Sequence, residues 1–235
     1  MKTPIRAVLF DLDGTLLDLD IDVLVEPYVR GLAQSVVHLV PPERFLPSLI
    51  QATALMRDNN GRASNAEVFA QSFYPAVGCS RQELEPLFER FYVEEFPKLR
   101  SYARRKTHAR EAVQTAFAQG FDVVIATNPL FPSMAIRQRL DWAGVGDFPY
   151  RLVTTYENSY AAKPNLAYFR HILSTIDQPA EHCIMVGDED IDMVAAHLGC
   201  RTFLIPSART CLASTTPTPT NRGTLADLIP MLRDM

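Results

Sequence analysis

The sequence predicts an α/β fold: a doubly wound parallel sheet with helices on both faces and a second, helical unit inserted into it. Short, continuous apolar runs alternate with helical patterns over the second part of the chain. A long and mainly helical stretch separates the first apolar run from the second. Continuous runs rich in Val, Ile, Leu and Phe are typical of strands buried on both faces. Strands that alternate with helices form parallel β-α-β units with right-handed crossovers.

Five strands are predicted from these runs. Each run is short and continuous rather than alternating in polarity, which favours a buried strand over a half-exposed one. The predicted strands are IRAVLF (5–10), FDVVIAT (121–127), YRLVTT (150–155), HCIMVG (182–187) and RTFLIP (201–206).

Helical patterns separate the last four predicted strands. Gly120 and Gly199 stand where helices commonly end. Ser133 is a candidate N-cap, and Pro164 stands near a helix start, where proline is tolerated. The helices are expected within 110–120, 133–144, 163–176 and 190–199.

About 100 residues separate the first predicted strand from the second, far more than one crossover helix requires. Pro and Gly punctuate this stretch into helical segments, and it contains no convincing strand pattern. The segments are 23–40, 42–58, 65–78 and 80–96. At the other end of the chain, 207–224 is expected to be a turn-rich loop, followed by a short helix over 225–235.

Composition narrows the class of protein. The chain has 235 residues, of which 47% are hydrophobic and 21% charged, with a net charge of −4. This acidic balance argues against nucleic acid or an anionic membrane as a partner. No apolar run approaches the roughly 18 residues of a membrane helix, and the N-terminus lacks a signal-peptide core, so we expect a cytoplasmic protein. The cysteines form no C-x-x-C pair, which argues against a zinc site: Cys79, Cys183, Cys200 and Cys211.

Polar side chains gather where the predicted strands end. In an open α/β sheet, ligands bind beyond the carboxyl ends of the strands, so these residues should converge on one crevice. Two aspartates one residue apart would repel each other there unless a cation lay between them, and Mg²⁺ prefers such oxygen ligands. The residues are Asp11, Asp13, Thr127, Asn128, Lys163, Asp188 and Asp192.

Four motifs in this order resemble those of the haloacid dehalogenase-like superfamily of phosphohydrolases. They are DLDGT (11–15), ATN (126–128), AKP (162–164) and VGDEDID (186–192). The resemblance covers the whole chain, and the helical insert is similar to the α-helical C1-type cap of that superfamily. It implies a Rossmannoid core with strand order 3-2-1-4-5, made of 1–17 and 100–235, and a cap over 18–99. The connections near 17–19 and 98–103 would be hinges.

The resemblance also implies the catalytic residues. Asp11 would be the nucleophile and form an aspartyl phosphate, since a carboxylate is already ionised at neutral pH. Asp13 would be the general acid for the leaving oxygen and then the general base for water. Lys163 would neutralise charge on the phosphoryl group, and Thr127 would hydrogen-bond its oxygens.

The remaining implied roles concern phosphate and metal binding. Asn128 would contact the phosphoryl group, and the backbone from Leu12 onward would contribute N–H donors, with Thr127 and Lys163 completing the phosphate site. Mg²⁺ would be held by the side chains of Asp11 and Asp188 and the backbone carbonyl of Asp13. Asp192 would bind a metal water or fix Lys163.

The resulting hypothesis is Mg²⁺-dependent hydrolysis of a small phosphorylated metabolite. A phosphomutase of the β-phosphoglucomutase type, which returns the phosphoryl group to a sugar, uses the same aspartate pair and is an alternative. A haloacid dehalogenase is disfavoured, because that chemistry needs no second acid at Asp13. A catalytically silent binding protein is disfavoured because Asp11, Asp13, Lys163 and Asp188 are all present. The sequence predicts neither the substrate nor the oligomeric state.

Overall fold

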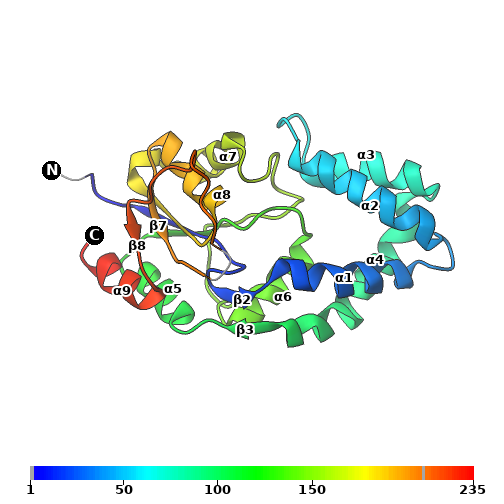
Figure 1. Cartoon of the computed structure of the whole chain (residues 1–235), viewed down its shortest axis with the longest axis horizontal. Helices are drawn as coiled ribbons and strands as arrows, with labels where there is room; N and C mark the ends of the chain where they lie inside the picture. Colours follow the sequence, from blue (N-terminus) through cyan, green and yellow to red (C-terminus); the bar gives the residue numbers. More distant parts are fainter. Residues whose placement is uncertain (1–2, 208–209) are drawn as a thin grey trace.

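A computed structural model describes residues 3–207 and 210–235 and contains one six-stranded, all-parallel sheet. Its strand order is β5-β4-β1-β6-β7-β8. The first five of these are the five predicted strands in the predicted order, so the fold class is confirmed (Figure 1). The strands are β1 (Ala7–Phe10), β4 (Asp122–Ile125), β5 (Leu152–Val153), β6 (Cys183–Gly187), β7 (Arg201–Leu204) and β8 (Asn221–Arg222).

Strand β8 was not expected, because it lies in the tail predicted to be a turn-rich loop. It consists of two exposed polar residues that pair with Phe203 and Leu204 at the sheet edge. An edge strand this short carries neither an apolar run nor an alternating pattern, so nothing in its sequence distinguishes it from a loop.

Helices cover both faces of the sheet. In the central strand β1, Val8 and Phe10 point to the core formed with α5 (Ala109–Ala118) and α9 (Leu225–Arg233). Ala7 and Leu9 point to the opposite core, formed mainly with α7. In Figure 1, α5 and α9 lie below the sheet and α7 and α8 above it. The other elements of this part of the chain are α6 (Ser133–Ala143), α7 (Leu166–Ile176), η2 (Ala180–His182), α8 (Asp190–Met193) and η3 (Val194–Leu198).

Between β2 (Leu17–Leu19) and β3 (Ala103–Arg105), the long insert consists of helices and their connections, as expected. Serine hydroxyls begin two of its helices with capping boxes, Ser64 with Glu67 and Ser80 with Glu83. These helices extend away from the sheet in Figure 1, and we call α1–α4 the cap helices. The elements are α1 (Ile21–Ser35), α2 (Pro42–Arg57), α3 (Asn65–Val77), α4 (Arg81–Glu94) and the 3₁₀ helix η1 (Phe96–Tyr102).

The two connections predicted to be hinges lie side by side. Leu17–Leu19 (β2) pairs antiparallel with Ala103–Arg105 (β3), so a two-stranded ribbon joins the cap helices to the core. The segment before β3 is the 3₁₀ helix η1 rather than an open linker. Three-residue strands are too short for a periodic signal, which is why the sequence did not predict the ribbon. The predicted domain limits and the hinge motion stay predictions.

A second attachment lies at the N-terminus of α3, where the buried side chain of Asn65 contacts the core. Its Nδ2 donates to the carbonyls of Pro129 (3.0 Å) and Ala161 (3.3 Å), and its Oδ1 accepts from Asn59 (2.8 Å). Its backbone N–H donates to the carbonyl of Ser159 at 2.8 Å. Asn65 therefore fixes the cap helices against two core loops.

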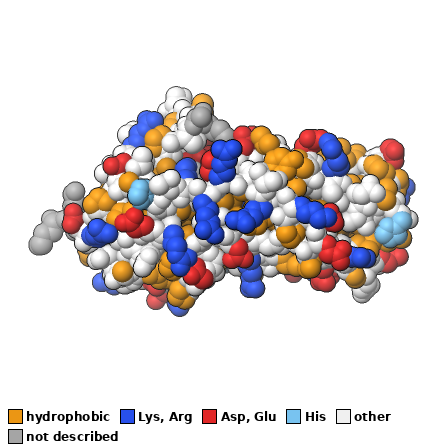
Figure 2. All heavy atoms as spheres, turned by 90° about the horizontal axis from the view of Figure 1, so that it is seen from below, with side chains coloured by type: hydrophobic (Ala, Val, Ile, Leu, Met, Phe, Trp, Pro, Cys, Tyr) orange, Lys and Arg blue, Asp and Glu red, His pale blue; other side chains and the backbone are white. Residues whose placement is uncertain are grey.

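Positively and negatively charged side chains are interspersed on the lower face of the molecule (Figure 2). Lys and Arg side chains cross the middle of the lower face of the molecule, where β3 lies, with Asp and Glu side chains close beside them (Figures 1 and 2). Arg104 and Arg105 of β3 are exposed. Among the described helices, none has the length and apolar character needed to span a bilayer.

Replacement of Asn65 should destabilise the protein. Asn65→Ala leaves the buried carbonyls of Pro129 and Ala161 without this donor, at a cost of about 1–3 kcal/mol. Urea unfolding measures the loss, with Asn60→Ala as control, since the Asn60 side chain is exposed and accepts a local bond from the backbone of Arg62. Equal stability of the two variants would contradict the assigned role of Asn65.

Candidate active site

The carboxyl ends of three neighbouring strands bring the predicted site residues together. β1 lies between β4 and β6, and Phe10 is level with Ile125 and Val186 in those strands. One residue beyond Phe10, the backbone N–H of Asp11 donates to the carbonyl of Val186 at 2.8 Å. The side chains that follow these strand ends therefore meet at the middle of one sheet edge.

Asp11, Lys163 and Asp192 form a buried ion cluster. Lys163 Nζ donates to Asp11 Oδ1 at 2.8 Å and to Asp192 Oδ1 at 2.5 Å. Burial alone would lower the pKa of Lys163, but the two carboxylates outweigh it and raise that pKa above its ordinary value. Lys163 is thus held as a cation beside Asp11.

Asp188 completes a group of carboxylates suited to a metal ion. Asp11, Asp188 and Asp192 are buried and offer oxygens that lie within 4.8 Å of one another. Burial, with the nearby charge of Asp11, raises the pKa of Asp188 to about 6. Oxygen donors without His or Cys suit Mg²⁺ rather than Zn²⁺, and a divalent cation would relieve the repulsion among them.

Three neighbours position Asp188. Thr15 Oγ1 donates to its Oδ1 at 3.2 Å, and Ser207 Oγ donates to its Oδ2 at 3.3 Å. Gly14 has a left-handed φ of +86°, and a Cβ there would lie 2.3 Å from Asp188 Oδ2. Only glycine satisfies both constraints, so the DLDGT loop can pack directly against this carboxylate.

The side chain of Asp13 pairs with an arginine and is not part of the cluster formed by Asp11, Asp188 and Asp192. Its Oδ2 forms an ion pair with Nη1 of Arg139, a fully buried residue of α6. Its Oδ1 is buried and has no hydrogen-bond partner among the described residues. Burial raises the pKa of Asp13, with Arg139 opposing and Asp11 adding to that shift. The predicted metal contact of Asp13 was its backbone carbonyl, and that contact stays a prediction.

Arg139 was missed by the sequence analysis. It follows Ile136 by three residues and precedes Leu140, so it lies on the buried face of α6. Its guanidinium carbon lies 4.5 Å from the centre of the Phe131 ring. The sequence did contain a signal for this residue: an arginine on the apolar face of a helix. A charge buried there requires a partner of opposite charge.

The other predicted residues lie around this cluster. Thr127 is buried, and its carbonyl accepts from Thr154 Oγ1 and the Tyr168 hydroxyl, which hold the end of the β4 loop in place. Asn128 Oδ1 is buried and unpaired among the described residues. Leu12 is fully buried, and its carbonyl accepts from the N–H groups of Leu16 and Leu17, which closes the loop.

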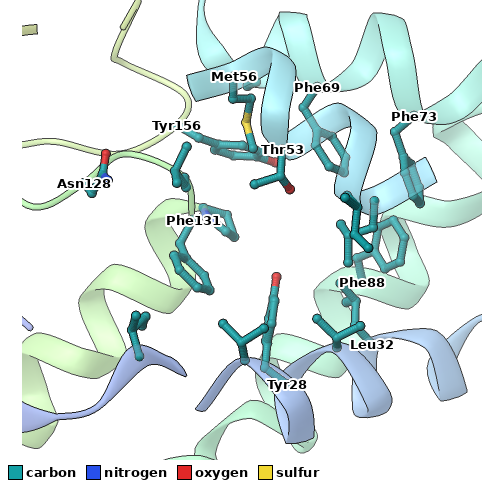
Figure 3. A pocket seen from close by; sticks show the side chains of 18 of the residues that line it. Tyr28, Leu32, Thr53, Met56, Phe69, Phe73, Phe88, Asn128, Phe131 and Tyr156 are labelled. Carbon is teal, nitrogen blue, oxygen red and sulfur yellow. The ribbon is translucent and has the colours of Figure 1, made fainter. Parts of the chain in front are cut away.

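A cavity joins this site to the cap helices. Asp11, Asp13, Thr127, Asn128 and Lys163 line one end of it. The other end is lined by side chains of α1–α4 (Figure 3). A molecule bound at the carboxylates would therefore extend between the core and the cap.

Known proteins are similar to this chain in sequence and in fold. The chain is 28% identical over 211 residues to a phosphoglycolate phosphatase of Vibrio cholerae, covering 85% of this chain and 83% of that one. The fold is similar to the putative hydrolase YfnB of Bacillus subtilis bound to magnesium (21% identity, TM-score 0.58, 98% and 99% of the chains). It is also similar to L-2-haloacid dehalogenase of Xanthobacter autotrophicus (14% identity, TM-score 0.59, 98% and 99%).

Family membership rests on a match to a family model over most of the chain. Residues 5–198 match the family described as haloacid dehalogenase-like hydrolases, a span that includes every predicted site residue. The predicted resemblance and the prediction of a hydrolytic enzyme are thereby confirmed. The chain belongs to the haloacid dehalogenase-like hydrolase family.

Proposed function

We propose that this protein is a Mg²⁺-dependent phosphatase that hydrolyses a small phosphate monoester through an aspartyl phosphate on Asp11. The observation that carries the proposal is the contact of Lys163 with Asp11, because it places a cation where phosphoryl charge would develop. The similarity to a phosphoglycolate phosphatase supports the same class of reaction.

The chemistry uses two steps at phosphorus. A carboxylate oxygen of Asp11 attacks the phosphorus atom, forming one P–O bond while the bond to the leaving oxygen breaks. Asp13 supplies the proton that this oxygen takes up. Water then attacks the phosphorus atom of the aspartyl phosphate and gives a proton to Asp13, while the bond between phosphorus and the Asp11 oxygen breaks. Inorganic phosphate leaves, Asp11 is again a carboxylate and Asp13 is again protonated.

The surrounding residues hold the phosphoryl group. Lys163 offsets its negative charge, while Thr127 and Asn128, which line the same end of the cavity, hydrogen-bond its oxygens. In this contact the Nδ2 group of Asn128 would be the donor, because phosphoryl oxygens only accept hydrogen bonds.

Asp11, Asp188 and the carbonyl of Asp13 would hold Mg²⁺, with Asp192 close by. Bound there, the ion would reduce the repulsion between the phosphoryl oxygens and the attacking carboxylate. Asp192 already contacts Lys163 at 2.5 Å, which favours its role in fixing the lysine over direct metal binding.

The phosphomutase and the silent binding protein remain alternatives without a specific observation in their favour. A phosphomutase would pass the phosphoryl group to a second hydroxyl rather than to water. A silent protein would not need Asp11, Lys163 and Asp188 assembled in one buried cluster.

Phosphate release from a panel of small esters tests the proposal. We expect turnover with Mg²⁺ that EDTA abolishes, and a loss of at least about 1000-fold in Asp11→Asn, which lacks the nucleophile. Asp18→Asn changes an exposed aspartate of β2 and should retain activity. Undiminished turnover in Asp11→Asn would contradict the assignment, and transfer of phosphate to a sugar without net release would favour the mutase.

Metal binding should stabilise the fold more at pH 8 than at pH 5. The raised pKa of Asp188, about 6 against an ordinary 3.8, means that the metal-free folded chain binds a proton near pH 5 that the unfolded chain does not. Ionised Asp188 therefore destabilises the metal-free folded state above pH 6. Mg²⁺ offsets this destabilisation at pH 8, where protons no longer compete with the ion for the carboxylate.

Thermal unfolding with and without Mg²⁺ measures this effect. A hundredfold excess over Kd corresponds to about 2.7 kcal/mol at pH 8. Asp188→Asn should remove the response, whereas Asp190→Asn, two residues further along, should keep it. A response that is larger at pH 5 would contradict the site.

Arg139 should act as a positioning residue for Asp13. We expect Arg139→Met to lower kcat about 10- to 100-fold with little change in KM, because it frees the proton-transferring carboxyl from the guanidinium that orients it. Arg139→Lys should restore part of kcat. The exposed Arg137 of the same helix provides the control Arg137→Met. Two results would contradict this role. One is a loss of kcat in Arg139→Met that Arg139→Lys does not restore at all, and the other is a change confined to KM.

A further inference from the structure

We propose that the substrate is a phosphate monoester of a bulky, apolar alcohol that contains an aromatic ring, bound in the cavity between the cap helices and the core. This inference rests on the proposed phosphatase function and adds the class of leaving group.

The cavity is far larger than a phosphoryl group and a two-carbon alcohol require. Its volume is about 1240 Å³, and it is continuous from Asp11 and Lys163 to the cap helices. Pockets that bury drug-sized ligands have volumes of about 300–1000 Å³. A small alcohol would leave most of this apolar space filled only with water.

Aromatic rings form facing walls of the cavity. Phe131 and Tyr156 come from core loops, whereas Tyr28, Phe69 and Phe88 come from cap helices, and their rings surround the same space (Figure 3). Leu32, Met56 and Phe73 complete the apolar lining (Figure 3). A flat ring inserted between such walls gains both apolar burial and ring–ring contact.

Exposed apolar side chains also belong to the lining of the cavity. Val25 of α1 and Leu46 and Ile50 of α2 line it, and they are 41%, 46% and 61% exposed. Large apolar side chains grouped at the mouth of a pocket mark a binding surface, since each would be covered by a bound apolar group. They therefore extend the apolar path outward from the ring-lined interior.

The cations that line the cavity do not provide a site for an acidic leaving group. Lys163 is held between two carboxylates at the catalytic end. Arg30 and Arg81 are exposed, and each forms an ion pair with a glutamate of its own helix. Arg57 is exposed at the end of α2. A carboxylate on the leaving group would therefore meet a lining at least as acidic as it is basic. Five glutamates belong to this lining: Glu26, Glu85, Glu89, Glu157 and Glu189.

The first test compares esters that differ only in the leaving alcohol. Ethyl, 2-phenylethyl and 2-(2-naphthyl)ethyl phosphate all release a primary alkoxide, so differences in kcat/KM report binding of the attached group. We expect kcat/KM to rise about 10- to 100-fold from ethyl to the ring-bearing esters. Octyl phosphate should be poorer than the naphthyl ester, and 2-phosphoglycolate no better than ethyl phosphate.

The second test fills the cavity. Thr53 of α2 points into it (Figure 3), and Thr53→Trp should lower the ratio of kcat/KM for the naphthyl ester to that for ethyl phosphate at least about tenfold. Leu55→Trp places the same side chain on the same helix at an exposed position outside the lining, and this ratio should not change. The Kd of the naphthyl ester for Asp11→Asn, measured with Mg²⁺ by calorimetry, should weaken in the Asp11→Asn/Thr53→Trp double variant.

The outcomes separate this inference from the proposed function. Turnover of several esters with equal kcat/KM, or a preference for phosphoglycolate or octyl phosphate, would overturn the aromatic leaving group and leave the phosphatase standing. Failure of every ester to release phosphate would overturn the phosphatase and the inference with it. A preference for the ring-bearing esters that Thr53→Trp removes and Leu55→Trp keeps would support both.

Discussion

The contact between Lys163 and two buried carboxylates is the interaction on which the site depends. Lys163 Nζ donates to Asp11 and to Asp192, and its positive charge offsets part of the cost of burying two acidic groups side by side. In the proposed mechanism, the same lysine would also lie beside the phosphoryl group. Burial raises the pKa of Asp188 and that of Asp192, and a divalent cation bound beside them would favour their ionised forms.

The sheet topology explains why this cluster forms where it does. β1 is central. The chain runs from it to β4 and β5 on one side of the sheet and then crosses to β6 and β7 on the other. Loops that follow neighbouring strands on the two sides of such a switch point diverge and leave a crevice. The cap is inserted at the same point, immediately after the DLDGT loop, and its return strand β3 pairs with β2 beside that loop. The residues proposed to select a leaving group and those proposed to act on phosphorus therefore line one cavity.

Much of this arrangement could be predicted from sequence because it depends on strong local signals. Continuous apolar runs marked the five main strands, and the polar residues after them marked the site. β2, β3 and β8 could not be predicted, since two or three residues carry no periodicity. Arg139 and Asn65 were missed for a different reason. Each is a polar residue whose role comes from a partner more than 60 residues away, Asp13 for Arg139 and the Pro129 carbonyl for Asn65.

The central claim is that Asp11 carries the phosphoryl group, and acid-quench mass spectrometry tests it most directly. The protein would be mixed with Mg²⁺ and the ester it hydrolyses fastest, quenched in acid within one turnover, and digested. The account predicts one added phosphoryl group on the peptide that contains Asp11, absent from Asp11→Asn treated in the same way. A phosphoryl group on another residue, or phosphate release without any phosphorylated peptide, would contradict it.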